Sequence, residues 1–311
     1  MGGISSDDGI RRWRVGDGEE VGKQAGVTVY AISVSRNDMW IVCGTEKGAS
    51  VWDGGMHNKV IEVEEEAGAV EAVDVAPDST RFATGTRAGK ASVWSIATGE
   101  RLVGPLEHAH FVNGVRFSPN GGRLATACYG GSIHIFDSHT GDDLVTIMID
   151  IRTWSPATSL AWSLDGQQIF AVSTNNNIRA FNTSTGSQLA GLQIVHDGED
   201  DVHSIALAPN NKFIATFANH SISFLDTSTL TRIGPVIEDS EQIRSIAISA
   251  DSNQLATGRT DGKIIIRDLS KILPDLFGPF HVSCDLDMSN NSHTAINYIG
   301  TYSRATTEGR A

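Results

Sequence analysis

Two histidines two residues apart, His108 and His110, are the clearest candidate metal ligands in the sequence. On an extended strand, residues i and i+2 lie on one face, so both imidazoles could reach one ion. A zinc site needs a third and a fourth ligand, and no further pair stands at a recognisable spacing. We therefore expect a structural His108 beside a solvent-facing His110, with no metal and no cofactor.

Two glycine–lysine segments resemble phosphate-binding loops, Gly-Thr-Arg-Ala-Gly-Lys at 85–90 and Gly-Arg-Thr-Asp-Gly-Lys at 258–263. A phosphate-binding loop needs wider glycine spacing, a Ser or Thr after the lysine, and a following helix. Neither segment meets these requirements, and we interpret both as hairpin turns. The sequence also lacks Gly-x-Ser-x-Gly, His-Glu-x-x-His and calcium-loop motifs, so we expect no catalytic residues and no enzyme.

Acidic residues gather in two short segments, and each segment precedes the start of an expected strand. Such charge runs are most often plain solvated surface, but two acidic loops on one rim would suit a partner rich in lysine or arginine. A cation and an aromatic side chain in a nearby loop add an anchor of the kind that concentrates binding energy. The predicted partner-binding residues are Glu46, Glu64, Glu65, Glu66, Arg87, Tyr129, Arg152, Trp154, Asp197, Glu199, Asp200 and Asp201.

The elements that must position these side chains come from a sequence pattern that is repeated six times along the chain. Each copy holds an alternating apolar strand, a turn, a second strand of small residues and a third strand, as in residues 112–137. A weaker fourth strand follows, as at 102–103. A fixed period of this length predicts a repeat architecture in which neighbouring units must stack. The first strands begin at Val29, Val70, Val112, Ala157, Val202 and Ile243, 41 to 45 residues apart.

Four antiparallel strands per repeat describe one blade of a β-propeller. The chain resembles the WD40 family in its Trp52-Asp53 dipeptide, its Phe-Ser-Pro-Asn-Gly turn at 117–121 and its Leu-Ala-Thr-Gly strand at 255–258. The resemblance covers nearly everything from Ser5 to Leu269. It implies an all-β propeller that docks peptides and assembles multiprotein complexes.

The resemblance also implies a hydrogen-bonded set inside each blade, formed by a His, a Ser or Thr, an Asp and a Trp. This chain departs from that pattern. The repeat that keeps His108 has Gly130 at the Asp position and Phe136 at the Trp position, and the last repeat has Arg267 at the Trp position. We therefore expect packing, more than polar networks, to hold the blades together.

We expect seven four-stranded antiparallel blades: six full repeats plus one blade that the two termini share. Residues 5–22 resemble the later strands of a blade, and residues 282–289 alternate as a first strand would. The predicted propeller covers residues 5–289, followed by a polar, disordered tail at 290–311. The alternatives are six blades with loose ends, or a propeller piece of a larger signalling or sensor protein.

Charge and cysteine content narrow the class of partner. The net charge of −13, without a basic stripe, argues against nucleic-acid binding. No apolar run approaches the roughly 18 to 20 residues of a membrane helix, which predicts no membrane partner. The three cysteines show no disulfide or metal spacing, which favours a reducing compartment, the cytoplasm, with the nucleus as an alternative.

A rigid ring that presents many short loops on one face favours a non-catalytic scaffold or adaptor for other proteins or peptides, including basic ones. The competing hypothesis is a quinoprotein-type dehydrogenase, whose propeller blades also carry Thr-Gly turns like Thr98-Gly99. That family would call for repeated Trp-docking motifs and a calcium site, and neither is visible in the sequence.

Overall fold

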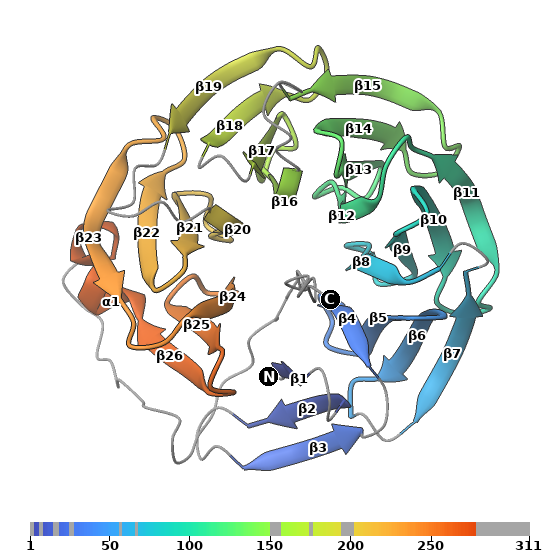
Figure 1. The fold of residues 1–311 in the computed structure, drawn as a ribbon, viewed down its shortest axis with the longest axis horizontal. Helices are drawn as coiled ribbons and strands as arrows, with labels where there is room; N and C mark the ends of the chain where they lie inside the picture. The colour runs from blue at the N-terminus through green and yellow to red at the C-terminus, as the bar shows by residue number, and fades with distance from the viewer. Residues whose placement is uncertain are drawn as a thin grey trace, which may run out of the picture.

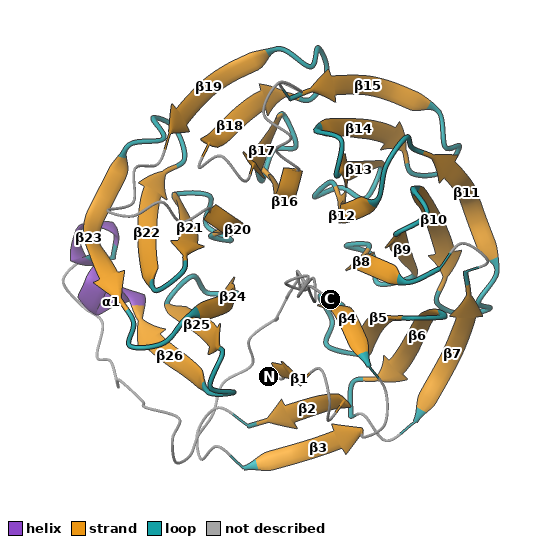
Figure 2. Cartoon of the chain, viewed as in Figure 1, coloured by secondary structure: helices purple, strands orange, loops and turns teal. Residues whose placement is uncertain are grey.

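The computed structural model describes residues 3–5, 9–14, 19–24, 28–55, 58–65, 68–149, 157–173, 177–193 and 202–277. Short antiparallel sheets follow one another around a ring, with each first strand innermost and each fourth strand outermost (Figure 1). Strands account for nearly all of the regular structure (Figure 2). The fold is therefore the all-β propeller that the repeats predict. None of the helices within the described segments has the length and apolarity to cross a bilayer.

Six blades follow the six repeats in chain order. Five of them are four-stranded, and the sixth has three strands within the described residues. Their bounds are β4 (Val29–Val34), β5 (Trp40–Thr45), β6 (Gly48–Asp53) and β7 (Lys59–Glu64); β8 (Val70–Val75), β9 (Arg81–Thr86), β10 (Lys90–Ser95) and β11 (Arg101–Glu107); β12 (Val112–Phe117), β13 (Arg123–Cys128), β14 (Ser132–Asp137) and β15 (Asp143–Met148); β16 (Ala157–Trp162), β17 (Gln168–Ser173), β18 (Asn177–Asn182) and β19 (Gln188–Gln193); β20 (Val202–Leu207), β21 (Phe213–Ala218), β22 (Ser221–Asp226) and β23 (Arg232–Glu238); and β24 (Ile243–Ile248), β25 (Gln254–Arg259) and β26 (Ile264–Asp268).

The apolar core lies between neighbouring blades. One buried cluster joins Val42 and Val51 of the first blade to Phe82 and Trp94 of the second, and the two aromatic rings stack with centroids 6.4 Å apart. Phe82 is fully buried, and burial of such a side chain stabilises the fold by about 1.5–3 kcal/mol. Because the larger clusters draw on two neighbouring blades, no blade can bury all of its apolar residues alone.

The two ends of the array differ from the prediction of seven complete blades, which is wrong. Residues before the first repeat form a three-stranded sheet of β1 (Gly3–Ser5), β2 (Gly9–Trp13) and β3 (Glu20–Gln24), and not a seventh four-stranded blade. Its innermost strand offers only three residues for pairing, half the length of the second strands elsewhere. The expected closing strand at 282–289 and the tail at 290–311 lie outside the described residues.

Within the described residues, the sixth blade shows three strands and no outer fourth strand. After β26 the chain turns into α1 (Leu269–Ile272) and the 3-10 helix η2 (Pro274–Leu276). The Asp268 side chain accepts a hydrogen bond from the Ser270 N–H, which caps α1 and ends the strand. Leu269, Leu273 and Phe277 then pack into the core that the fifth and sixth blades share. A helical cap thus covers the apolar surface of this blade.

Candidate functional site

One face of the ring carries the loops between second and third strands and the segments before first strands. In each four-stranded blade, antiparallel pairing brings together the start of the first strand, the end of the second, the start of the third and the end of the fourth. We call the surface that these ends form the rim face. Glu46, Arg87 and Tyr129 follow β5, β9 and β13 directly, so the structure places all three on it. The Arg87 N–H donates to Ala69 O and the Tyr129 N–H to Phe111 O, which fixes both loops in the same way. These predicted residues therefore occupy equivalent positions.

A bulge recurs near the start of each first strand. In all six blades the register shifts between the first and third residues of that strand. Such a bulge leaves one residue outside the ladder and re-aims its side chain. In the first three blades the residues concerned are Tyr30, Glu71 and Asn113. They lie beside the predicted loops on the rim face, and the alternating sequence pattern alone does not single them out.

Arg87 is held between two neighbouring blades. Its Nε lies 2.6 Å from Glu71 Oε1, and its guanidinium lies 5.5 Å from the centroid of the Tyr30 ring. Burial raises the pKa of Glu71, and the nearby Arg87 charge offsets only part of that rise. The Arg87 side chain is still 42% exposed. It therefore presents a fixed cation to solvent, with its orientation set by a carboxylate and an aromatic face.

An exposed aromatic pair stands on the same face at the third blade. Phe111 and Tyr129 are 52% and 46% exposed, with ring centroids 6.0 Å apart. Gly130 follows Tyr129, and a Cβ at this position would lie 2.2 Å from Cδ2 of His110. The glycine at the family's Asp position therefore makes room for the exposed His110 ring. Large exposed aromatics in contact with each other are typical of binding surfaces.

The remaining predicted contact residues divide into three groups. Glu46 and Glu64 are exposed on the rim face. The side chain of Glu65 is only 2% exposed, so it acts inside the blade and cannot contact a partner directly. The other predicted residues fall outside the described part of the chain: Glu66, Arg152, Trp154, Asp197, Glu199, Asp200 and Asp201.

Glu65 rebuilds the polar set of the second blade. Trp94 Nε1 donates to Thr84 Oγ1 at 3.0 Å, and Thr84 Oγ1 donates to Glu65 Oε1 at 2.8 Å. Arg101 completes the set, 3.2 Å from Glu65 Oε2 and 4.6 Å from the Trp94 ring centroid. The acid occupies the place of His108 in the next blade, since both donate their backbone N–H to the turn of the preceding hairpin.

The sixth blade also has a polar set whose residue types differ from the family pattern. Arg267 donates to Thr257 Oγ1 at 2.7 Å and pairs with Asp239, which also lies 2.8 Å from Arg259. Burial alone would raise the pKa of Asp239, but hydrogen bonding and charge from Arg267 and Arg259 outweigh it, so this pKa is lowered. Polar sets therefore accompany the packing in these two blades, and the expectation that packing contributes more than polar networks stays a prediction. The sets persist with different residue types.

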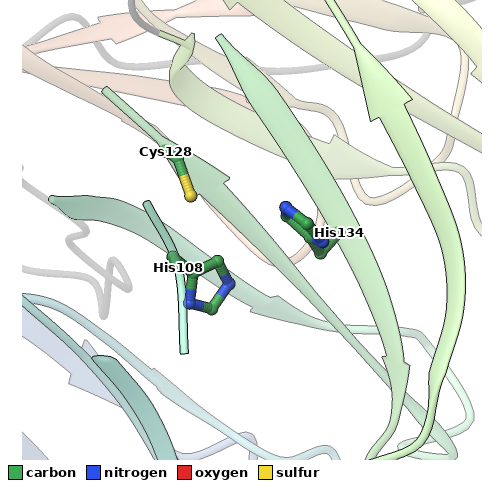
Figure 3. Close-up of side chains that lie close together, drawn as sticks. All are labelled: His108, Cys128 and His134. Carbon is green, nitrogen blue, oxygen red and sulfur yellow. The ribbon is translucent and has the colours of Figure 1, made fainter. Parts of the chain in front are cut away.

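The third blade brings together three groups that could hold a metal. His108 hydrogen-bonds Thr126, while His110 is exposed, as the sequence predicts for this pair. The sequence does not predict that Cys128 and His134 join His108, with candidate ligand atoms all within 4.8 Å of one another (Figure 3). His134 could have been identified from the hairpin register. Thr126, which hydrogen-bonds His108, and His134 are direct cross-strand partners.

A cavity of about 580 Å³ lies among the first strands of the six blades. Its charged lining residues are Arg36, Asp74 and Arg116; small and apolar side chains form most of the rest. Asp74 accepts a hydrogen bond from the Phe117 N–H at 2.8 Å and lies 3.6 Å from Arg116. Burial raises the pKa of Asp74, and Arg116 offsets part of the effect. Asp74 thus links the second and third blades across the cavity wall.

Comparison with known proteins agrees with this architecture. The ring of radial antiparallel sheets defines a β-propeller. The profile of the WD40 family, described as WD domain, G-beta repeat, matches residues 101–137 and 231–268. These two repeats and the blade arrangement together identify the chain as a WD40 propeller protein.

Among solved structures, the crystal structure of the computationally designed Ika8 protein is similar in fold, with a TM-score of 0.69 and 20% sequence identity. The alignment covers 86% of this chain and 80% of that chain. At this identity the likeness concerns the fold alone. No curated protein sequence matches the chain.

Proposed function

We propose that the protein is a non-catalytic interaction scaffold that docks a partner protein or peptide on its rim face. WD40 propellers usually lack catalytic activity and generally bind other proteins. The observation that carries the proposal is the exposed aromatic pair of Phe111 and Tyr129, which lies on the face that the repeats also predict. Aromatic side chains of this kind supply large contact areas at low entropic cost.

The chemistry of the rim face suits a partner with apolar groups, with basic groups for its exposed acids and with an acidic group for Arg87. The aromatic pair offers the apolar contact, and Arg87 is already oriented by Glu71 and Tyr30, so little ordering is required on binding. Glu46 and Glu64 add exposed acids. By their position in the sequence, Glu66, Arg152, Trp154, Asp197, Glu199, Asp200 and Asp201 belong to the same proposed surface.

Three predictions from the sequence remain part of the proposal. The protein acts in the cytoplasm, consistent with the free, buried thiols of Cys43 and Cys128. Its partners are proteins or peptides, without nucleic acid or membrane. The propeller could act alone or within a larger signalling or sensor protein. The quinoprotein-type dehydrogenase hypothesis gains no support, because the matched family is WD40.

Binding measurements on paired variants test the proposal. A partner is first isolated by cross-linking to the intact chain, and its affinity is measured with the purified components. We expect the double variant Phe111→Ala/Tyr129→Ala to weaken binding by at least about tenfold, the scale of truncated interface anchors. Leu164→Ala is the matched control, because Leu164 is 61% exposed but lies in a hairpin turn on the opposite face. Loss of affinity in the control alone would place docking on that face and refute the proposal.

A further inference from the structure

The cluster of His108, Cys128 and His134 lies within the third blade, and its Cys128 directly precedes Tyr129 of the exposed aromatic pair. The ligands come from the segment before β12, from the end of β13 and from β14 (Figure 3). Cys128 is buried and both histidines are half-buried. The two imidazole rings meet edge to face with centroids 5.0 Å apart. Three metal-binding side chains therefore converge on one partly enclosed point.

The hydrogen bonds of His108 turn one ring nitrogen toward that point. Its Nδ1 lies 2.9 Å from Leu106 O, a carbonyl that can only accept, so Nδ1 carries the proton. Nε2 then holds a lone pair and accepts from the Thr126 hydroxyl at 2.8 Å. A neutral imidazole with an anchored Nδ1–H is the form that ligates metal ions.

His134 is oriented in the same way by a carboxylate. Its Nδ1 lies 3.1 Å from Asp143 Oδ2, and its Nε2 lies 3.2 Å from Ser132 Oγ. With Nδ1–H donated to Asp143, Nε2 holds the lone pair, which accepts from Ser132 Oγ. A carboxylate behind a histidine fixes the ring and raises its basicity, an arrangement that recurs around zinc.

Cys128 supplies the third group. Its side chain is a free, buried thiol. A metal ion must therefore displace the proton: the S–H bond breaks, the sulfur–metal bond forms, and the proton passes to solvent. The two histidines contribute nitrogen lone pairs.

We propose that this cluster is a zinc site in which His108 Nε2, Cys128 Sγ and His134 Nε2 bind one Zn²⁺, with water as the fourth ligand. Zinc accepts mixed imidazole and thiolate ligands and imposes no geometry of its own. Tetrahedral bond lengths place such ligand atoms roughly 3.3–3.6 Å apart. The present separations, up to 4.8 Å, must shorten by roughly 1 Å, so Thr126 Oγ1 and Ser132 Oγ release the two nitrogens on binding. The site is independent of the proposed docking function.

A cobalt titration tests the assignment on the intact, reduced protein. We expect one equivalent of Co²⁺ to give tetrahedral visible bands and a thiolate-to-cobalt charge-transfer band, and Zn²⁺ to displace it. Cys128→Ser should abolish the charge-transfer band and weaken Zn²⁺ binding by at least about 100-fold, since it removes a direct ligand. Cys43→Ser is the matched control, because Cys43 is also buried in a second strand, that of the first blade. A charge-transfer band that survives Cys128→Ser would overturn the proposal.

X-ray absorption on the zinc-loaded wild-type protein gives a second test that needs no variant. The proposal predicts one sulfur at about 2.3 Å and nitrogen or oxygen ligands at about 2.0–2.1 Å. A zinc shell without sulfur, or the absence of stoichiometric binding, would refute the site even if Cys128→Ser fails to fold.

Discussion

Glu65 lies at a position where the WD40 pattern uses histidine, and it joins three polar groups of the second blade. It accepts from Thr84, pairs with Arg101 and, through Thr84, reaches the Trp94 indole. Removal of such a buried acceptor leaves its partners unsatisfied, which costs more than the hydrogen bonds themselves contribute. At this scale the identity of the residue matters less than the hydrogen-bonding group it supplies.

We expect Glu65→Ala to lower the free energy of unfolding by about 2 kcal/mol, because Thr84 is buried and Arg101 loses its counter-ion. The adjacent Glu64 is exposed, so Glu64→Ala should change it by no more than about 0.5 kcal/mol. Urea denaturation of the three proteins at neutral pH measures both values. Equal effects of the two substitutions would show that the buried set does not stabilise the blade.

Asp239 gives the stability of the sixth blade a defined pH dependence. Its pKa in the folded state is lower than the ordinary value of 3.8, so the folded protein binds fewer protons there than the unfolded chain. Its contribution is complete above the unfolded pKa and is lost as the pH falls through the folded pKa. We expect Asp239→Asn to lose less stability than wild type between pH 5 and about pH 2, as measured by urea denaturation. Parallel curves would contradict this role.

Equivalent hairpin turns can differ in how well they tolerate substitution of their glycine, because different atoms surround each glycine. Gly89 and Gly262 occupy the same turn in the second and sixth blades, with φ of +76° and +80°. A Cβ on Gly89 would lie 2.7 Å from His108 O, whereas a Cβ on Gly262 would meet nothing within 4 Å. The turn of the second blade is therefore closed against the segment that carries His108.

Substitution of both glycines by alanine separates backbone strain from steric conflict. Each alanine bears the cost of a left-handed conformation, about 1–2 kcal/mol. Gly89→Ala also forces backbone atoms apart, so it should destabilise the protein clearly more than Gly262→Ala, by roughly a further 1–3 kcal/mol. Thermal unfolding of the two variants compares them directly. A larger loss for Gly262→Ala would contradict the turn geometry.

The sequence predicts elements better than it predicts their exceptions. Periodic apolar strands and turn residues set the six repeats and the hairpin order, because alternation and turn chemistry are local. The helical end of the sixth blade depends on the Asp268 cap and on packing of Leu273 and Phe277. The cluster around His108 depends on the register between β13 and β14. The polar set of Glu65 depends on its contact with Thr84, which lies in another segment of the chain. These features involve contacts between segments, which a repeat pattern does not encode.

In the whole molecule, the ring explains the regular order of the loops on the rim face. Neighbouring blades share their cores, so each loop of the rim face is mounted on a packed sheet. Such mounting allows Tyr129 and Arg87 to be exposed without loosening the blades. The array combines a stable framework with a surface on which side chains can vary.

Docking of a partner protein on the rim face would shield the aromatic pair from solvent. The most direct measurement is hydroxyl-radical footprinting of the wild-type chain, free and with a purified partner bound. We predict that oxidation of Phe111 and Tyr129 falls on complex formation, while that of Leu164 on the opposite face is unchanged. Protection of Leu164 with undiminished oxidation of the aromatic pair would contradict the claim.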